Sequence, residues 1–250
     1  MPKQIQSIER ALFILESIMF NNEPVTGTEL ARQLGVHKST VSHLTATLVE
    51  KGYLCKVPGS SKLTTGPKLY RAGRMVGLSG EQIIAVPPVL AELAARTGET
   101  AHLAELRGRY VIFLENQYPE KALRVHTETG SVEAAHSTAV GKALLAGLDD
   151  EEVRELLAQS GLEAFTDKTI TDVDGLLSEL ANVREKGYAA DSGEQTPGTG
   201  CIAAPVHDVR GMTVAAVGIS GPEARVFDDE TERAGAVVAC AGKIDEILRG

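Results

Sequence analysis

The chain has 250 residues, of which 43% are hydrophobic and 24% charged, and its net charge is −9 at pH 7. This is the composition of ordinary globular domains, and the length suits about two of them. No apolar run approaches the roughly 20 residues of a membrane span, and the polar N-terminus differs from a secretory signal, so we expect a cytoplasmic protein without a membrane partner. Three cysteines without a Cys-x-x-Cys pattern support neither a disulfide framework nor a thiolate zinc site.

Charge is distributed unevenly along the chain. Residues 1–66 carry seven Lys or Arg and five Glu, a net charge of +2, which leaves −11 for the rest. An acidic body with a mildly basic head argues against polyanion binding by the whole molecule, but it permits DNA contact at one end.

The first two predicted helices lie within the basic head. Apolar residues recur at three- and four-residue spacing over 4–20, which predicts an amphipathic helix. Thr26 and Glu29 have the spacing of a capping box, so a second helix should run over 27–34 and stop at Gly35.

A third helix should start at residue 37 or 38 and end at residue 51, with Gly52 as its left-handed cap. Two helices joined by a short glycine-containing turn form a helix-turn-helix unit. Strands over 53–57 and 62–65 read as a hairpin, so the whole unit is a winged helix. The buried stripe of the third helix is expected to be Val41, Leu44 and Leu48.

The face of this helix opposite the buried stripe carries small and hydrogen-bonding side chains. Such residues suit phosphates and base edges in a DNA groove. The alternative is an exposed, solvated face without a DNA role. The residues proposed to contact DNA are Lys38, Ser39, Thr40, Ser42, His43, Ala46 and Thr47.

The remaining pattern predicts a linker helix over 67–80 and a separate domain over 81–250. Helices flanking a mostly antiparallel sheet make the second domain α+β. Its predicted helices span 82–97, 136–146, 149–159, 174–186 and 228–249, and its predicted strands span 100–106, 110–115 and 122–127 and begin near residues 188, 201 and 213.

Polar side chains concentrate over 187–222, where a short strand should lead into a Gly-, Thr- and Pro-rich loop and then into two apolar strands. Loops on rigid scaffolds often form small-molecule pockets. The helix that Ser137 or Thr138 should cap offers the opposite wall, because the first backbone N–H groups, at Ala139 and Val140, have no intrahelical partner. Two alternatives stay open: Ser137 caps those groups so that nothing binds, or Asp191 only caps its own loop.

Asp191 restricts which ligand fits. An ionised Asp191 would repel a carboxylate held at the helix start unless it is protonated, points away or faces a donor. This favours a bifunctional ligand with an acceptor at one end and a donor at the other, such as a hydroxy acid, a keto-acid hydrate or an amide.

Two other classes of function use the same residues. Cys201, His136 and Asp191 form a conceivable nucleophile constellation of a hydrolase, although a Cys at the start of a buried strand is more often inert. Metal sensing has little support, because no pair has metal-ligand spacing on one element among His102, His126, His136, His207 and Cys201. We therefore expect no catalysis, cofactor or metal.

Two long motifs, HSTAVGKALLA over 136–146 and GYAADSGE with GCIAAPVHD and VGISGP over 187–222, follow the winged helix. With them the chain resembles the IclR family of bacterial transcription regulators over nearly its whole length. The resemblance implies a winged helix-turn-helix joined to a GAF-like effector domain, a homodimer or dimer of dimers, operator DNA as partner, and a small organic acid, amide or aromatic effector.

The resemblance also implies effector contacts and shows departures. Family members often have Gly-Ala at residues 139–140 and Ser at residue 218, which implies a narrower and less polar pocket here. They commonly have Pro, Tyr and Arg at residues 37, 42 and 43, so the operator sequence cannot be taken from the family. Glu194 and Thr196 have no assigned role beyond lining or closing the loop. The positions of the family's effector contacts are Val125, Ala139, Val140, Asp191, Cys201 and Ser220.

These sequence features and the resemblance together predict a ligand-responsive regulator, and we expect it to repress rather than to activate transcription. Effector binding would shift the placement of the winged helices through the linker helix over 70–80. A dimer would read a pseudo-palindromic site with half-sites about one helical turn apart.

Overall fold

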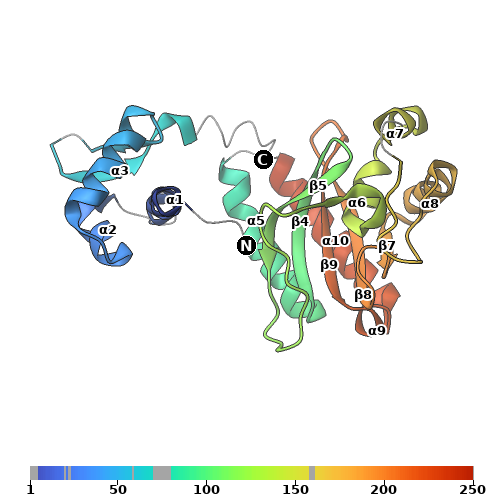
Figure 1. Cartoon of the computed structure of the whole chain (residues 1–250). Coiled ribbons are helices and arrows are strands. Elements are labelled where there is room, and N and C mark those ends of the chain that lie inside the picture. The colour runs from blue at the N-terminus through green and yellow to red at the C-terminus, as the bar shows by residue number, and fades with distance from the viewer. Residues whose placement is uncertain are drawn as a thin grey trace. The chain divides into compact units, whose positions relative to one another are not determined.

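The computed structural model describes residues 5–19, 21, 24–57, 59–69, 80–157 and 161–249, with the backbone alone over 80–84. The chain divides into two compact units, Met1–Gly80 and Glu81–Gly250 (Figure 1). Residues 67–69 begin a helix, and the rest of the predicted linker up to residue 79 lies outside the described residues.

Besides the helix start at 67–69, the described part of the N-terminal unit contains three helices and a small antiparallel sheet with strand order β1-β3-β2. The predicted capping box is confirmed, because the Thr26 hydroxyl accepts from the Glu29 N–H and the Glu29 carboxylate accepts from the Thr26 N–H. Gly35 ends the second helix in the left-handed region, as predicted. The elements are α1 Gln6–Met19, β1 Val25–Thr26, α2 Gly27–Leu34, α3 Lys38–Glu50, β2 Leu54–Lys56 and β3 Lys62–Thr65.

Helix α3 packs on this unit's core with a stripe that differs from the predicted one. Val41 is buried as expected, but Leu44 and Leu48 are half-buried. Thr45 is the second buried residue of the helix, and its hydroxyl donates to the Val41 carbonyl at 2.8 Å. Because this bond satisfies the hydroxyl locally, a polar side chain is tolerated there.

The C-terminal unit contains a six-stranded sheet with order β6-β5-β4-β9-β8-β7, and every neighbouring pair is antiparallel. The α+β class is therefore confirmed. The strands are β4 Thr100–Arg107, β5 Tyr110–Gln117, β6 Val132–Ala134, β7 Ala189–Ser192, β8 Thr199–His207 and β9 Thr213–Pro222.

Helices cover both faces of this sheet (Figure 1). On one face α10 packs against β8 and β9 and is joined to α5 by an ion pair between Lys243 and Glu92. On the other face α6 lies on the strands, with α7 and α8 beside it. These helices are α5 Gly80–Thr97, α6 Ala139–Leu145, α7 Asp150–Leu157, α8 Val173–Lys186, α9 Glu223–Val226 and α10 Glu230–Arg249.

The prediction of a strand over 122–127 is wrong, because this segment is a loop and the third strand of that hairpin region is β6. Side chains rather than a neighbouring strand satisfy its carbonyls. Thr100 donates to the Val125 carbonyl at 2.6 Å, Arg225 to Leu123 at 3.1 Å and Tyr118 to Thr127 at 2.5 Å. The segment is therefore fixed without belonging to the sheet.

Alternation along the strands selects which side chains face α6. Ala104 of β4, Ala203 of β8 and Ala216 of β9 belong to the core cluster that includes α6. Successive strand residues point to opposite faces, so His102 and Ser220 lie on the same face as these alanines. The space under the start of α6 is thus lined by polar side chains of the central strands.

Candidate effector pocket and DNA-binding face

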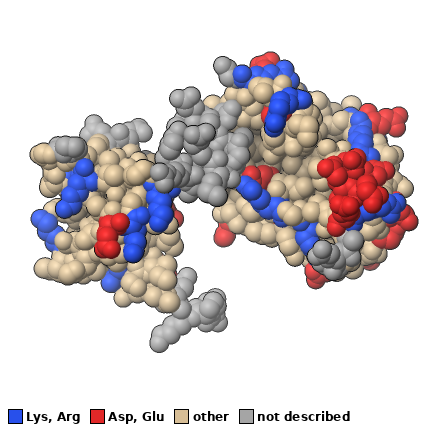
Figure 2. All heavy atoms as spheres, turned by 90° about the horizontal axis from the view of Figure 1, so that it is seen from above, with Lys and Arg blue, Asp and Glu red and all other residues tan. Residues whose placement is uncertain are grey.

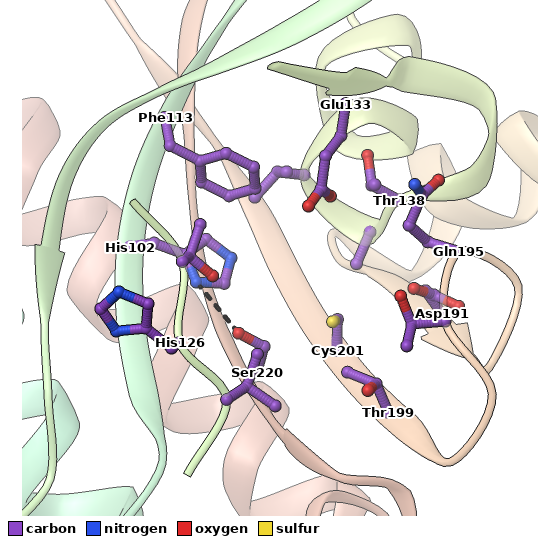
Figure 3. A pocket seen from close by; sticks show the side chains of 15 residues that line it. His102, Phe113, His126, Glu133, Thr138, Asp191, Gln195, Thr199, Cys201 and Ser220 are labelled. Carbon is purple, nitrogen blue, oxygen red and sulfur yellow. Dashed lines mark hydrogen bonds between the residues drawn. The ribbon is translucent and has the colours of Figure 1, made fainter. Parts of the chain in front are cut away.

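A cavity of about 210 Å³ lies between the start of α6, the sheet and the loop after β7 (Figure 3). All six residues proposed as effector contacts line it: Val125, Ala139, Val140, Asp191, Cys201 and Ser220. The structure therefore brings together residues that are separated widely in the sequence. The residues that sequence reasoning did not place there are His102, Phe113, His126, Thr127, Glu133, Thr138, Gln195, Thr196 and Thr199.

The start of α6 is capped by Thr138, whose hydroxyl accepts from the Gly141 N–H at 3.2 Å. Ser137 does not cap the helix, because its hydroxyl donates to the Ala134 carbonyl and to the Gln195 side chain. The backbone N–H groups of Ala139 and Val140 have no acceptor in the described chain and border the cavity. Such N–H groups at a helix start are unpaired donors.

Gly141 allows the preceding 3₁₀ turn over residues 135–137 to lie against α6. A Cβ at Gly141 would lie 2.1 Å from the Ala135 carbonyl oxygen, which no side chain tolerates. This close approach positions the helix start at the cavity wall.

Asp191 both caps its own loop and faces the cavity. Its carboxylate accepts from the Glu194 N–H at 2.6 Å, and the side chain is only 1% exposed. Burial raises the pKa of Asp191 to about 6, and the nearby Glu194 carboxylate adds to the rise. Asp191 is therefore ionised at neutral pH but is readily protonated below it.

Glu194, which had no predicted role, forms a buried ion pair with Lys142 of α6. The Lys142 ammonium is 1% exposed and lies 2.6 Å from Oε1 of Glu194 and 3.9 Å from a Glu179 oxygen. Burial raises the pKa of Glu194, an effect that Lys142 opposes. The pair fixes the loop after β7 to α6.

The same loop is held from a second side by hydroxyl groups. Thr169 donates to the Glu194 carbonyl at 2.6 Å, and Thr166 donates to the Gly193 carbonyl at 2.8 Å. The loop that closes the cavity is thus tied to its surroundings on both sides, although its Gly and Pro content permits flexibility.

His102 is one of three neighbours that crowd the glycine at position 218. The ring lies against Gly218, where a Cβ would come within 3.0 Å of His102 Nε2, and its Nδ1 lies 3.4 Å from the Ser220 hydroxyl. Burial lowers the pKa of His102 to about 4, so the ring is neutral at physiological pH. A Cβ at position 218 would also lie 2.9 Å from the Ile202 carbonyl oxygen and 3.0 Å from the Ala203 Cβ. These two groups and the neutral imidazole together fill the room that a serine side chain there would need.

The hydrolase alternative is not supported by the geometry. The His136 ring bonds to the Glu163 carbonyl at 3.0 Å and does not line the cavity. Burial, followed by the charges of Asp191 and Glu133, raises the pKa of the Cys201 thiol, so a nucleophilic thiolate is disfavoured. Among the described residues, no three His, Cys, Asp or Glu side chains gather in a way that could hold a metal ion.

The proposed DNA-binding face of α3 is open to solvent. Of the seven proposed residues, only Thr40 is half-buried and the other six are exposed. His37 caps the helix by accepting from the Ser39 N–H, and its ring also contacts the Ser39 hydroxyl at 2.9 Å. On the N-terminal unit, Figure 2 shows Lys and Arg side chains in excess over acidic ones, whereas the C-terminal unit displays a large acidic cluster. No described helix is long and apolar enough to cross a membrane.

A winged helix-turn-helix followed by a domain with a small cavity is typical of ligand-responsive DNA-binding regulators. The chain matches the IclR helix-turn-helix domain over residues 7–58 and the C-terminal domain of bacterial transcriptional regulators of the IclR type over residues 78–246. It therefore belongs to the IclR family of transcriptional regulators.

Individual relatives agree with this assignment. The transcriptional regulator XynR of Escherichia coli is 36% identical over 228 residues, which cover 90% of each chain. The transcriptional repressor IclR of E. coli is 33% identical over 242 residues, covering 96% of this chain and 88% of the relative. The crystal structure of Thermotoga maritima IclR superposes with a TM-score of 0.65 at 29% identity, covering 98% of this chain and 99% of that one.

The raised pKa of Asp191 predicts how stability depends on pH. The folded chain binds the Asp191 proton more tightly than the unfolded chain, so this residue lowers stability as pH rises from about 4 to about 6. At neutral pH the ionised group costs up to about 3 kcal/mol. Asp191→Asn keeps the acceptor for Glu194 without the charge, so we expect the variant to be more stable than wild type at neutral pH.

Urea denaturation at several pH values measures this difference, which should shrink below about pH 4. Asp228→Asn, at an exposed position, is the matched control and should leave the pH profile unchanged. An Asp191→Asn protein less stable than wild type at neutral pH would contradict the expectation.

Proposed function

We propose that a small effector occupies the cavity under the start of α6 and changes operator binding by the winged helices, most simply as a repressor acting in the cytoplasm. The observation that carries this proposal is the cavity itself, which gathers the helix N–H groups of Ala139 and Val140, the carboxyl of Asp191 and the hydroxyl of Ser220. Relatives named as repressors favour that sign of regulation.

The effector we propose is a small organic acid, amide or aromatic compound with an acceptor at one end and a donor at the other. The acceptor would lie at the N–H groups of Ala139 and Val140, where the positive end of α6 favours it. The donor would face Asp191. Val125 and Phe113 supply an apolar wall.

The operator contact we propose is the exposed face of α3 with the wing beside it. Lys38 would bind a phosphate near the helix start, while Ser42, His43 and Ala46 would reach base edges. The segment over 70–79, which would carry the change in placement between the units, lies outside the described residues.

We also propose a homodimer, or a dimer of dimers, as the state that binds DNA. Helix α1 supports it, because Leu12 is 52% exposed and its apolar neighbours are also exposed although the opposite side of the helix is buried. An exposed apolar face of this kind marks a protein interface more often than a solvated surface. The exposed apolar residues of this region are Ile5, Ile8, Leu12, Phe13 and Met19.

The DNA-binding face predicts different effects for a phosphate contact and a base contact. Lys38→Ala should weaken binding to all DNA sequences and reduce the salt dependence of log K by about one phosphate charge. His43→Ala should cost about 1–3 kcal/mol on the operator and relax its specificity. Fluorescence anisotropy at several salt concentrations separates the two, and the exposed Lys186→Ala on α8 is the matched control. Equal salt slopes for Lys38→Ala and wild type would count against the assignment.

The apolar face of α1 predicts the effect of a charge on assembly. Leu12→Asp should shift the protein toward smaller species, because burying an unpaired carboxylate in an apolar interface is costly. Light scattering coupled to gel filtration measures the mass. Met212→Asp introduces the same charge at an exposed apolar residue of the other unit and should change nothing. A Leu12→Asp protein of unchanged mass would place the interface elsewhere.

Release of operator DNA by a cavity ligand tests the regulator mechanism directly. We expect compounds that raise the melting temperature of the full chain also to change its affinity for the DNA upstream of its own gene. Ser220→Ala should weaken both effects in parallel, because that hydroxyl lies in the cavity. A compound that binds the cavity without altering the footprint would argue against coupling.

A further inference from the structure

Glu133 is a carboxylic acid in the cavity without a partner. It lies on β6 at the edge of the sheet, opposite Val111 of β5, and its side chain points into the cavity (Figure 3). No hydrogen bond or ion pair joins its carboxyl group to any residue that the structure describes. Burial alone raises its pKa. The side chain is half-buried, and a carboxyl group that the protein leaves unpaired in a cavity can accept hydrogen bonds from a ligand.

Asp191 presents a second carboxyl group to the same space. Figure 3 shows both side chains pointing into the cavity from different walls, with Cys201 close to them. Burial raises the pKa of the Cys201 thiol, and the charges of Asp191 and Glu133 add to the rise. The cavity therefore holds two acids on its walls.

Cationic side chains do not balance this pair. Among the described residues, the lining of the cavity includes neither Lys nor Arg. Lys142 does not line the cavity. Its side chain is only 1% exposed and forms ion pairs with Glu194 and Glu179. His102 is the buried imidazole of the lining and is neutral, since its pKa is about 4. The cavity is thus acidic on one side. Its donors include uncharged groups such as the hydroxyls of Thr138, Thr199 and Ser220 and the Gln195 amide.

We infer that the effector carries a donor-rich group, either an ammonium or a set of hydroxyls, that lies between Glu133 and Asp191, and that dicarboxylate effectors are excluded. This inference rests on the proposed function of the cavity as the effector site. Glu133 is then a residue that determines specificity, because it selects the group at the end of the ligand that faces away from the α6 N–H groups.

The physical reason is the balance of charge in a site of low polarity. A donor group supplies the hydrogen bonds that the protein withholds from Glu133, and bonds to charged groups are worth roughly tenfold to a hundredfold in affinity. A dicarboxylate places a further negative charge beside two acids, where water screens the repulsion poorly.

Four-carbon probes of matched length test the inference on the full chain. Erythritol presents hydroxyls, 1,4-diaminobutane presents ammonium groups, 4-aminobutanoate presents one ammonium and one carboxylate, and succinate presents two carboxylates. Binding is measured by calorimetry and by the shift in melting temperature at neutral pH. We expect at least one donor-bearing probe to bind more than tenfold tighter than succinate, and the ranking of the three distinguishes an amine from a polyol effector.

Variants assign the effect to the acids. Glu133→Gln should weaken the best donor-bearing probe by about tenfold or more and improve succinate binding, and Asp191→Asn should act in the same direction. Glu155→Gln, at an exposed residue of α7, is the matched control and should leave all four affinities unchanged.

Preferred binding of succinate by wild type, no binding by any donor-bearing probe, or equal affinities in wild type and Glu133→Gln would each overturn the inference. Failure of the proposed function is distinguishable. It would appear as probes that bind with the predicted ranking but leave operator affinity unchanged.

Discussion

The ion pair between Lys142 and Glu194 joins the two walls of the cavity. Lys142 lies on α6 and Glu194 on the loop after β7, and the ammonium is almost fully buried. Removing one partner would leave an uncompensated charge in the interior, at a cost of about 3–5 kcal/mol. Because Glu194 also holds Asp191 through its backbone N–H, the position of the cavity's acid depends on the same contact.

These contacts form a short chain of hydrogen bonds that links the cavity to α6 within the C-terminal unit. A ligand that engages Asp191 acts on a group bonded directly to Glu194, and Glu194 is bonded to α6 through Lys142. Oxygen Oε2 of Glu194 is buried without a hydrogen-bond partner, so the carboxylate has an unused acceptor. Small changes at the ligand can therefore alter how the loop and α6 are held, since packed interiors transmit displacement.

The sequence predicts local features better than the lining of the cavity. The capping box at Thr26 and the left-handed Gly35 were readable because their signals lie within a few residues. The resemblance placed Asp191 and Cys201, which line the cavity. Residues 122–127 look like a strand by composition, but their hydrogen-bond partners are Thr100, Tyr118 and Arg225, which only the tertiary fold brings near.

Glu133 and His102 could not be predicted for a related reason. Neither belongs to a motif, and each enters the cavity only once the strand register is known. His102 pairs with Gly218 of β9, so its surroundings depend on a contact between distant parts of the chain. Side chains of β4 alternate between the two faces of the sheet. Once the strand register is known, this alternation places His102 on the face that α6 covers.

The pairing of β4 with β9 also sets the order in which the protein becomes functional during synthesis. Thr100 pairs with Ser220, so the centre of the sheet cannot close until nearly the whole chain has left the ribosome. The winged helix, whose contacts are local, is complete before then. At roughly 5–20 residues per second, the delay is on the order of ten seconds. During synthesis the winged helix thus folds before the effector cavity exists.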